Sequence, residues 1–182
     1  MWAGQFLSEG LNILIKRFVR QPRPDLSLGD GYGFPSSHSQ YMGYFSSFLV
    51  AHIYFTHRFG RSGSRVLDSL FRWGVYGALG GWAGVVAYSR YHLGYHTPFQ
   101  IVSGLAIGVS LGLPLYVVVQ LWPERYPESL LGKAKRALLD LGLVRWLQIR
   151  DGWAIWGDGG REEEWKRWRR EYDVKNQKKK SR

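Results

Sequence analysis

The stretch YHLGYHTPFQIVSGLAIGVSLGLPLYVVVQLWP, from Tyr91 to Pro123, contains no Lys, Arg, Asp or Glu. Two further stretches, Gly31–His57 and Trp73–Ser89, also lack these residues. A membrane helix needs about 20 predominantly apolar residues to cross a hydrocarbon core of ~30 Å. Buried helices of a soluble bundle are the alternative, but three uncharged stretches in 182 residues favour a membrane. The sequence therefore predicts an all-α fold, a multi-pass transmembrane helix bundle.

Four membrane-associated helices are expected, at residues 2–20, 38–57, 72–91 and 98–122. The first carries Glu9 and Asn12, so it is expected to pack within the bundle rather than face lipid. Small residues four apart let helix backbones approach closely, although Gly is also enriched in membrane helices generally. Helix contacts are therefore expected along the third and fourth helices, at Gly77 and Gly81, Gly80 and Gly84, and Gly104, Gly108 and Gly112.

The net charge of +11 invites a nucleic-acid-binding interpretation, but the distribution of the charge argues against it. The loop Arg58–Arg72 has four Arg and one Asp, and residues 124–182 have sixteen Lys and Arg against ten Asp and Glu. If the spans alternate, loop and tail lie on one side, which the positive-inside rule makes the cytosol. The sequence predicts a membrane-embedded core, residues 1–123, a basic cytosolic tail, residues 124–182, and no nucleic-acid partner.

Three short blocks lie where uncharged stretches begin or end: Lys16-x6-Arg23-Pro24, Pro35-Ser36-Ser37-His38 and Ser89-Arg90-x5-His96. Alternating spans would bring these helix ends to the same membrane face, so the blocks are expected to converge. Lys and Arg neutralise phosphate oxygens. One His can attack phosphorus while a second His protonates the leaving group. The pattern predicts phosphoryl-transfer chemistry at that face.

At these residues the chain resembles the membrane phosphatases of the phosphatidic acid phosphatase type 2 superfamily, whose motifs are K-x6-RP, PSGH and SR-x5-H-x3-D. Ser37 stands where the family usually has Gly, and Gln100 where it has Asp. Both departures are similar to the dolichyldiphosphatase branch, which reads PSSHSQ and YHT-x-x-Q. Further similarity lies in Ser8-Glu9-Gly10, Ile149-Arg150-Asp151 and Arg161-Glu162-Glu163. The family core normally has about two more helices upstream, so the resemblance implies that this chain lacks them.

The resemblance implies a set of phosphate-binding residues that combines cations with the start of a helix: Lys16, Arg23, Ser36, Ser37 and Arg90. Ser36 lies at a loop-to-helix junction, where its hydroxyl can cap the helix and exposed N–H groups face an anion. An ordinary N-cap is the alternative. Arg20 could be a third cationic ligand, but a solvated or headgroup-facing position is expected.

The resemblance also implies the catalytic residues. His96 is expected to be the nucleophile that forms a phosphohistidine, and His38 the general acid that protonates the leaving oxygen. Gln100 is expected to orient His96 through its carbonyl, without the charge of the family's Asp; the good leaving group of a diphosphate would tolerate the weaker nucleophile. No metal or cofactor is expected. His92 and His96 at i, i+4 permit a zinc interpretation, but no carboxylate lies near them in the sequence.

The expected function is metal-independent hydrolysis of dolichyl (polyprenyl) diphosphate to the monophosphate and phosphate, supporting dolichol recycling for protein N-glycosylation. The alternatives are a lipid phosphate monoester phosphatase and a non-catalytic protein that binds lipid phosphates. His38 and His96 argue against the second, because cations alone would suffice to bind phosphate. The chain ends Lys179-Lys180-Ser181-Arg182, which resembles a dilysine signal for coat-protein recognition, or is simply a solvated basic tail. The expected location is the endoplasmic reticulum membrane, with a lumenal active site and a cytosolic C-terminus.

Overall fold

A computed structural model of the protein describes residues 1–24, 31–60 and 62–180. Every regular element in this described part is a helix, so the all-α prediction is confirmed. The four long helices are α1 (Trp2–Val19), α2 (Ser37–Phe55), α3 (Arg65–His92) and α4 (Pro98–Tyr116). They coincide with the four expected helices, except that α3 begins before residue 72 and α4 ends before residue 122.

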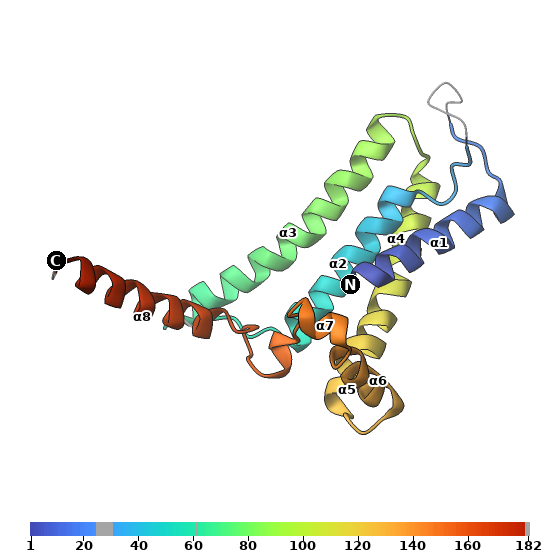
Figure 1. The fold of residues 1–182 in the computed structure, drawn as a ribbon. Coiled ribbons are helices and arrows are strands. Elements are labelled where there is room, and N and C mark those ends of the chain that lie inside the picture. The colour runs from blue at the N-terminus through green and yellow to red at the C-terminus, as the bar shows by residue number, and fades with distance from the viewer. Residues whose placement is uncertain (25–30, 61, 181–182) are drawn as a thin grey trace.

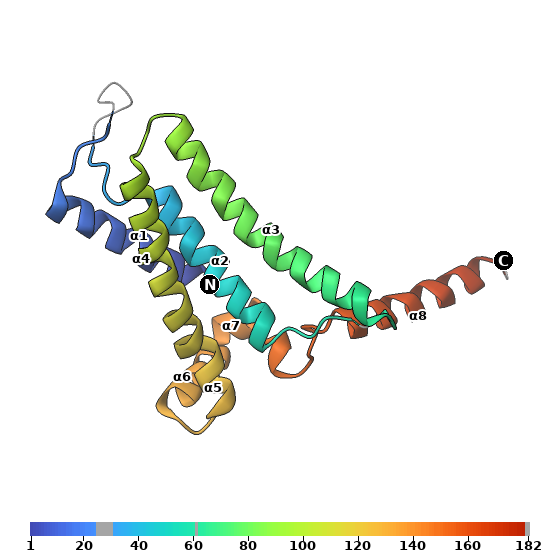
Figure 2. The same ribbon diagram turned by 180° about the vertical axis from the view of Figure 1, so that it is seen from behind.

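Shorter helices follow α4 in the chain. The π-helical segment η2 (Val117–Leu121) continues α4 into α5 (Trp122–Arg125). The remaining elements are α6 (Leu130–Leu139), α7 (Gly142–Trp146), the 3₁₀ turn η3 (Gly152–Ala154) and α8 (Arg161–Lys180). Figures 1 and 2 show that α8 projects away from the other helices.

Local sequence explains where the long helices begin and end. α1 stops at Arg20, which adopts a left-handed conformation (φ 49°) and donates its backbone N–H to the carbonyl oxygen of Lys16. Pro22 follows, and a proline cannot continue the hydrogen-bond ladder of the helix. α4 begins with a capping box between Thr97 and Gln100, in which each side chain bonds the backbone of the other residue.

The closest helix pair is α2 and α4, and glycine makes it possible. Gly104, Gly108 and Gly112 of α4 all lie against the backbone or side chains of α2. A Cβ atom added to Gly104 would lie 2.6 Å from the carbonyl oxygen of Ser36, which is too close for any side chain. The predicted contact along the fourth helix is confirmed.

The predicted glycine contact along the third helix is wrong for the described chain. A Cβ atom added to the predicted positions of α3 would meet no atom within 4 Å; these are Gly77, Gly80, Gly81 and Gly84. α3 instead buries Ala83 and Ala87, and the hydroxyl of Ser46 on α2 donates to the carbonyl oxygen of Leu79 at 3.2 Å. At about 100° of rotation per residue, Gly77, Gly81 and Gly84 lie about 100–160° around the helix from Ala83, and Gly80 lies at the edge of this contact face.

The bundle buries polar side chains and exposes large apolar ones. The buried polar residues of the helices include Ser8, Asn12, Gln40 and Gln100. Side chains that are more than 60% exposed include Phe6, Phe18, Trp82 and Phe99. Of the helices in the described part, the continuous helix Pro98–Arg125 is the one that is long and apolar enough to cross a membrane.

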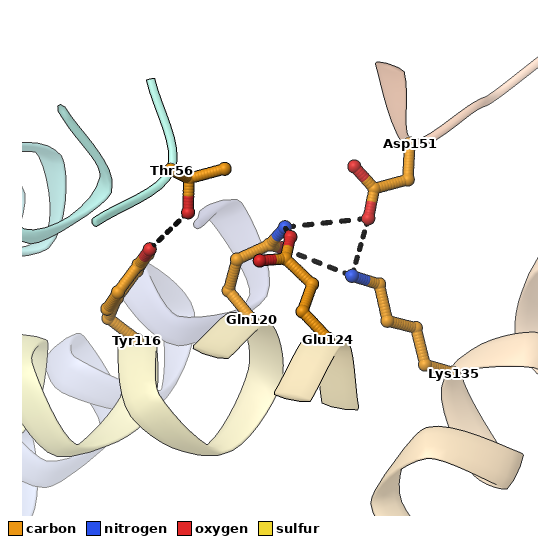
Figure 3. Close-up of polar contacts among 6 residues, drawn as sticks. All are labelled: Thr56, Tyr116, Gln120, Glu124, Lys135 and Asp151. Carbon is orange, nitrogen blue, oxygen red and sulfur yellow. Dashed lines mark hydrogen bonds and ion pairs between the residues drawn. The ribbon is translucent and has the colours of Figure 1, made fainter. Parts of the chain in front are cut away.

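A polar cluster attaches the chain after residue 123 to the end of α4, and we call this region the tail end (Figure 3). Gln120 of η2 donates to Asp151 at 3.4 Å, and Lys135 of α6 forms an ion pair with the same carboxylate at 2.5 Å. Beside this cluster, the hydroxyls of Tyr116 and Thr56 lie 2.6 Å apart and join α4 to the end of α2. The part of the tail before α8 therefore packs against the end of the bundle.

Candidate functional site

The three sequence blocks lie at the opposite end of the bundle, where α1 and α3 end and α2 and α4 begin (Figure 1). We call this region the motif end. Hydrogen bonds join the blocks: Lys16 to Ser37 at 2.8 Å, and the backbone N–H of Ser36 to the carbonyl oxygen of Gln100 at 3.1 Å. Residues separated widely in sequence are thus brought together, as the alternation of helices predicts.

His96 is 6% exposed and lies in the short connection between α3 and α4. Its Nδ1 is 3.1 Å from Oε1 of Gln100. Nε2 of Gln100 donates to the carbonyl oxygen of Pro22 at 3.1 Å, and Oε1 accepts from the backbone N–H of Thr97 at 3.3 Å. These partners fix the amide orientation, so Nδ1 of His96 carries the proton and Nε2 keeps its lone pair.

The surroundings of His96 also favour the neutral imidazole. Burial lowers the pKa of His96 below its ordinary value of 6.5, and the positive charges of Lys16 and Arg23 lower the pKa further. Hydrogen bonds with Gln100 and with the backbone of Gly33 act in the opposite direction. A neutral ring with a free lone pair is the form that can act as a nucleophile.

His38 and Arg90 lie on the open side of the motif end. His38 is exposed at the start of α2, close enough to Arg90 and Lys16 to feel their positive charges. The Arg90 guanidinium lies 5.3 Å from the centre of the Tyr95 ring, and its Nε donates to the Ser89 hydroxyl at 3.2 Å. The predicted His pair therefore consists of one exposed and one buried ring, with cations beside both.

The Ser36 side chain occupies the N-cap position of α2, the alternative considered for it. It is fully buried, and its hydroxyl oxygen accepts from the hydroxyl of Ser39 at 3.0 Å. The capping arrangement directs the first backbone N–H groups of α2 toward the motif end, where an anion can bind. Binding by these N–H groups would not require the Ser36 hydroxyl itself.

A continuous chain of hydrogen bonds runs beneath the site. Lys16 Nζ donates to the Ser37 hydroxyl, which donates to Asn12 Oδ1, and both distances are 2.8 Å. Asn12 Nδ2 donates to Gln40 Oε1 at 2.8 Å. Gln40 Nε2 then donates to the carbonyl oxygen of Ser8 at 2.7 Å and to its hydroxyl at 3.0 Å.

No role in the site was predicted for Ser8, Asn12 or Gln40. The available signal was their spacing, because Ser8, Asn12 and Lys16 lie at i, i+4 and i+8 and therefore on one face of α1. Three polar residues on one face of an apolar helix indicate a buried polar partner on a neighbouring helix. The partner itself, Gln40, became visible only when α1 and α2 were placed side by side.

The other predicted positions lie outside this arrangement. Arg20 is exposed and donates to the carbonyl oxygen of Arg17 at 3.0 Å, as expected for a solvated residue. His92 is exposed and stacks on Tyr88, and residues 1–24, 31–60 and 62–180 contain no group of three or more His, Asp or Glu that could hold a metal. His52 packs on Trp153, far along α2 from His38. The side chains of Lys179 and Lys180, with Ser181 and Arg182, lie outside the described residues.

Comparison with curated proteins finds relatives of similar identity in several organisms. The chain is 35% identical over 147 residues to palmitoyl-protein thioesterase-dolichyl pyrophosphate phosphatase fusion 1 of Schizosaccharomyces pombe, covering 80% of this chain and 20% of that protein. It is 36% identical to dolichyldiphosphatase 1 of Homo sapiens, covering 64% and 50%. Lipid phosphate phosphatase gamma of Arabidopsis thaliana is 35% identical, covering 80% and 60%.

The chain thus spans half the length of the human relative and a fifth of the fission-yeast one. No solved structure matches the chain. The sequence model of the PAP2 superfamily matches residues 2–124, which include all three blocks of the motif end. This match covers well over half of the sequence, and it shows that the chain belongs to the PAP2 superfamily.

Proposed function

We propose that the protein is a membrane lipid phosphatase that hydrolyses dolichyl diphosphate to dolichyl phosphate and phosphate. The observation that carries this proposal is the buried His96, whose proton is fixed on Nδ1 by Gln100. The dolichyldiphosphatase names of the fission-yeast and human relatives support the substrate. The product would re-enter the dolichol cycle that supplies protein N-glycosylation.

The proposed reaction has two steps. In the first, Nε2 of His96 forms a bond to the terminal phosphorus while the bond from this phosphorus to the bridging oxygen breaks, and His38 gives its proton to the leaving dolichyl phosphate. In the second, His38 takes a proton from water, which attacks the phosphohistidine. This attack releases inorganic phosphate and restores neutral His96. Lys16, Arg23 and Arg90, with the first N–H groups of α2 after Ser36, would stabilise the charge on the transferring phosphoryl oxygens.

Gln100 favours a diphosphate over a monoester. An Asp at this position would add a negative charge that stabilises the imidazolium formed as His96 attacks. The neutral amide orients the ring but supplies no charge, and replacing a carboxylate by an amide costs about 10⁴-fold in serine hydrolases, where it also leaves the wrong tautomer. A phosphate is a better leaving group than an alkoxide, so a diphosphate requires less help from the nucleophile.

We further propose that the chain crosses the endoplasmic reticulum membrane several times, with residues 1–123 as the membrane core. The exposed apolar side chains and the buried polar network support lipid surroundings, because polar groups in a bilayer must find partners inside the protein. The basic loop Arg58–Arg72 and the tail, residues 124–182, would be cytosolic, the motif end lumenal, and the C-terminal lysines available to coat proteins.

A second candidate function is hydrolysis of lipid phosphate monoesters, which the name of the Arabidopsis relative favours. Phosphate release from polyprenyl diphosphate, polyprenyl phosphate and phosphatidic acid, each with and without EDTA, separates the two. The proposal expects release from the diphosphate to be fastest and unaffected by EDTA. Faster release from either monoester would overturn the substrate assignment, and loss of activity in EDTA would overturn the metal-independent mechanism. A His96→Ala protein serves as the blank.

A further inference from the structure

We infer that Ser37, Asn12 and Gln40 are positioning residues that hold the Lys16 ammonium in place, and that the Ser37 hydroxyl is not itself a phosphate ligand. The inference deepens the proposed function and rests on it, since Lys16 is placed there among the phosphate ligands. Its basis is the chain of hydrogen bonds that runs from Lys16 to the backbone of α1.

The donor and acceptor count at Ser37 supports this role. A serine hydroxyl has one hydrogen to donate and two lone pairs. Its hydrogen is committed to Asn12 Oδ1 at 2.8 Å, and one lone pair accepts from Lys16 Nζ at 2.8 Å. No hydrogen remains for an ionised phosphate oxygen, which can only accept. The hydroxyl can therefore hold the lysine, whereas binding phosphate would break its bond to Asn12.

The direction of this series of hydrogen bonds is fixed at its end near Gln40 and Ser8. Gln40 Nε2 faces the carbonyl oxygen of Ser8, which can only accept. If the Gln40 amide were flipped, its oxygen would face the carbonyl oxygen of Ser8. If the Asn12 amide were flipped, its oxygen would face Gln40 Oε1. Asn12 and Gln40 are each 1% exposed, so water cannot replace a lost partner. Each link therefore has one orientation.

This arrangement leaves two of the three N–H donors of Lys16 for substrate. Lysine has a flexible stem whose rotamer freedom is lost when the ammonium binds an anion. Here the restriction is already imposed by Ser37, whose own hydroxyl is oriented by Asn12. A glycine at position 37, as in the pattern that this chain departs from, could not hold the lysine in this way.

A double-mutant cycle tests whether Ser37 acts through Lys16. We expect Ser37→Ala to lower kcat/KM for polyprenyl diphosphate about tenfold, the size of one hydrogen bond to a charged group. In a Lys16→Met background the same substitution should change kcat/KM less than about twofold, because the lysine it positions is gone. Equal effects in both backgrounds would show a direct role of the hydroxyl in phosphate binding and overturn the inference.

Three further single variants and one double variant complete the test. Ser37→Thr keeps the hydroxyl and should stay within about threefold of the parent. Asn12→Ala should reproduce the Ser37→Ala defect, and the two substitutions together should be no worse than one. Ser46→Ala removes a hydroxyl from the same helix that bonds Leu79 instead, and it should leave kcat/KM unchanged. The inference would be contradicted if Ser37→Thr were as impaired as Ser37→Ala. It would also be contradicted if the effects of Asn12→Ala and Ser37→Ala were additive in the double variant.

A binding measurement separates this inference from the proposed reaction. The same cycle is repeated by calorimetry with inorganic pyrophosphate as the probe. If the protein binds pyrophosphate with the expected coupling but hydrolyses no lipid diphosphate, the proposed reaction fails and the positioning role stands. If the protein hydrolyses the lipid diphosphate but the effects of Ser37→Ala and Lys16→Met are additive, the positioning role alone fails. Absence of both binding and turnover overturns both.

Discussion

At the motif end, Asn12, Gln40 and Gln100 are each 1% exposed, whereas at the tail end the side chains of Lys135 and Asp151 are 22% and 13% exposed. Both ends are polar, but these three amide side chains are closed to water, whereas water partly reaches the Lys135–Asp151 pair. A buried polar group left without its partner costs about 1–3 kcal/mol. The Lys135–Asp151 pair is only partly exposed, and ion pairs that are fully exposed contribute about 0–1 kcal/mol. Loss of one partner in the buried network at the motif end should therefore cost more stability than loss of the ion pair at the tail end.

The largest differences between the two ends are expected when their histidines are removed. We expect His96→Ala to lower the diphosphatase kcat by at least about 10³-fold, because no other side chain can take the place of a lost nucleophile. His38→Ala should cost about 10²–10⁴-fold through loss of the general acid. His52→Ala, which removes a ring packed on Trp153 at the tail end, should leave kcat within about twofold.

Initial rates with polyprenyl diphosphate, on proteins whose thermal melting is unchanged, provide the measurement. Retention of more than a few per cent of activity by His96→Ala would sink the phosphohistidine mechanism. A large loss in His52→Ala would instead show that the tail end takes part in catalysis.

The pH dependence of kcat/KM and of the free energy of unfolding should report the lowered pKa of His96 at the motif end. Burial holds the pKa of His96 below 6.5, so the neutral nucleophile should persist to lower pH than for a solvated imidazole. We expect the acid limb of kcat/KM, which reports His96, to lie below pH 6.5 and to fall about tenfold per pH unit beneath the lowered pKa, while loss of the His38 proton sets the alkaline limb. The unfolded chain binds this proton at higher pH than the folded chain, so the free energy of unfolding should also fall as the pH drops.

Rate profiles and urea unfolding between pH 4 and pH 8 would show both effects, with the titration of the diphosphate substrate measured separately. An acid limb centred above pH 6.5 would disagree with the buried, cation-flanked position of His96.

A smaller change is expected when the amide at the motif end is replaced by a carboxylate. Gln100→Asp should retain diphosphatase activity and raise the rate with polyprenyl phosphate by about tenfold, since the added charge makes His96 a stronger base and nucleophile. The ratio of the two rates is the readout. A folded variant that has lost diphosphatase activity would show that the amide, through its bond to Pro22, has a role of its own.

The smallest effect is expected at the tail end. Asp151→Asn removes the ion pair with Lys135 and should lower the free energy of unfolding by no more than about 1 kcal/mol, with kcat unchanged. Urea unfolding in detergent, together with the diphosphatase assay, tests both statements. A fall in kcat beyond about threefold would mean that the two ends are coupled.

The sequence was sufficient for the helices and for the convergence of the three blocks, because uncharged stretches and proline positions mark helix ends locally. The sequence could not predict the features that depend on which faces of two helices contact each other. Gly108 and Gly81 lie in similar patterns, yet only Gly108 contacts another helix, since the contact face of α3 is set by Ala83 and Ala87. The link from Asn12 to Ser37 escaped prediction for the same reason.

Detection of a phosphoryl group on His96 during turnover would test the proposed mechanism most directly. Polyprenyl diphosphate labelled at its terminal phosphate would be mixed with enzyme, quenched in alkali because phosphohistidine is labile in acid, and the labelled residue identified by mass spectrometry. We expect label on His96 in the parent protein and none in His96→Ala. Efficient turnover without any label on His96 in rapid-quench samples, or label that persists in the His96→Ala protein, would contradict the account.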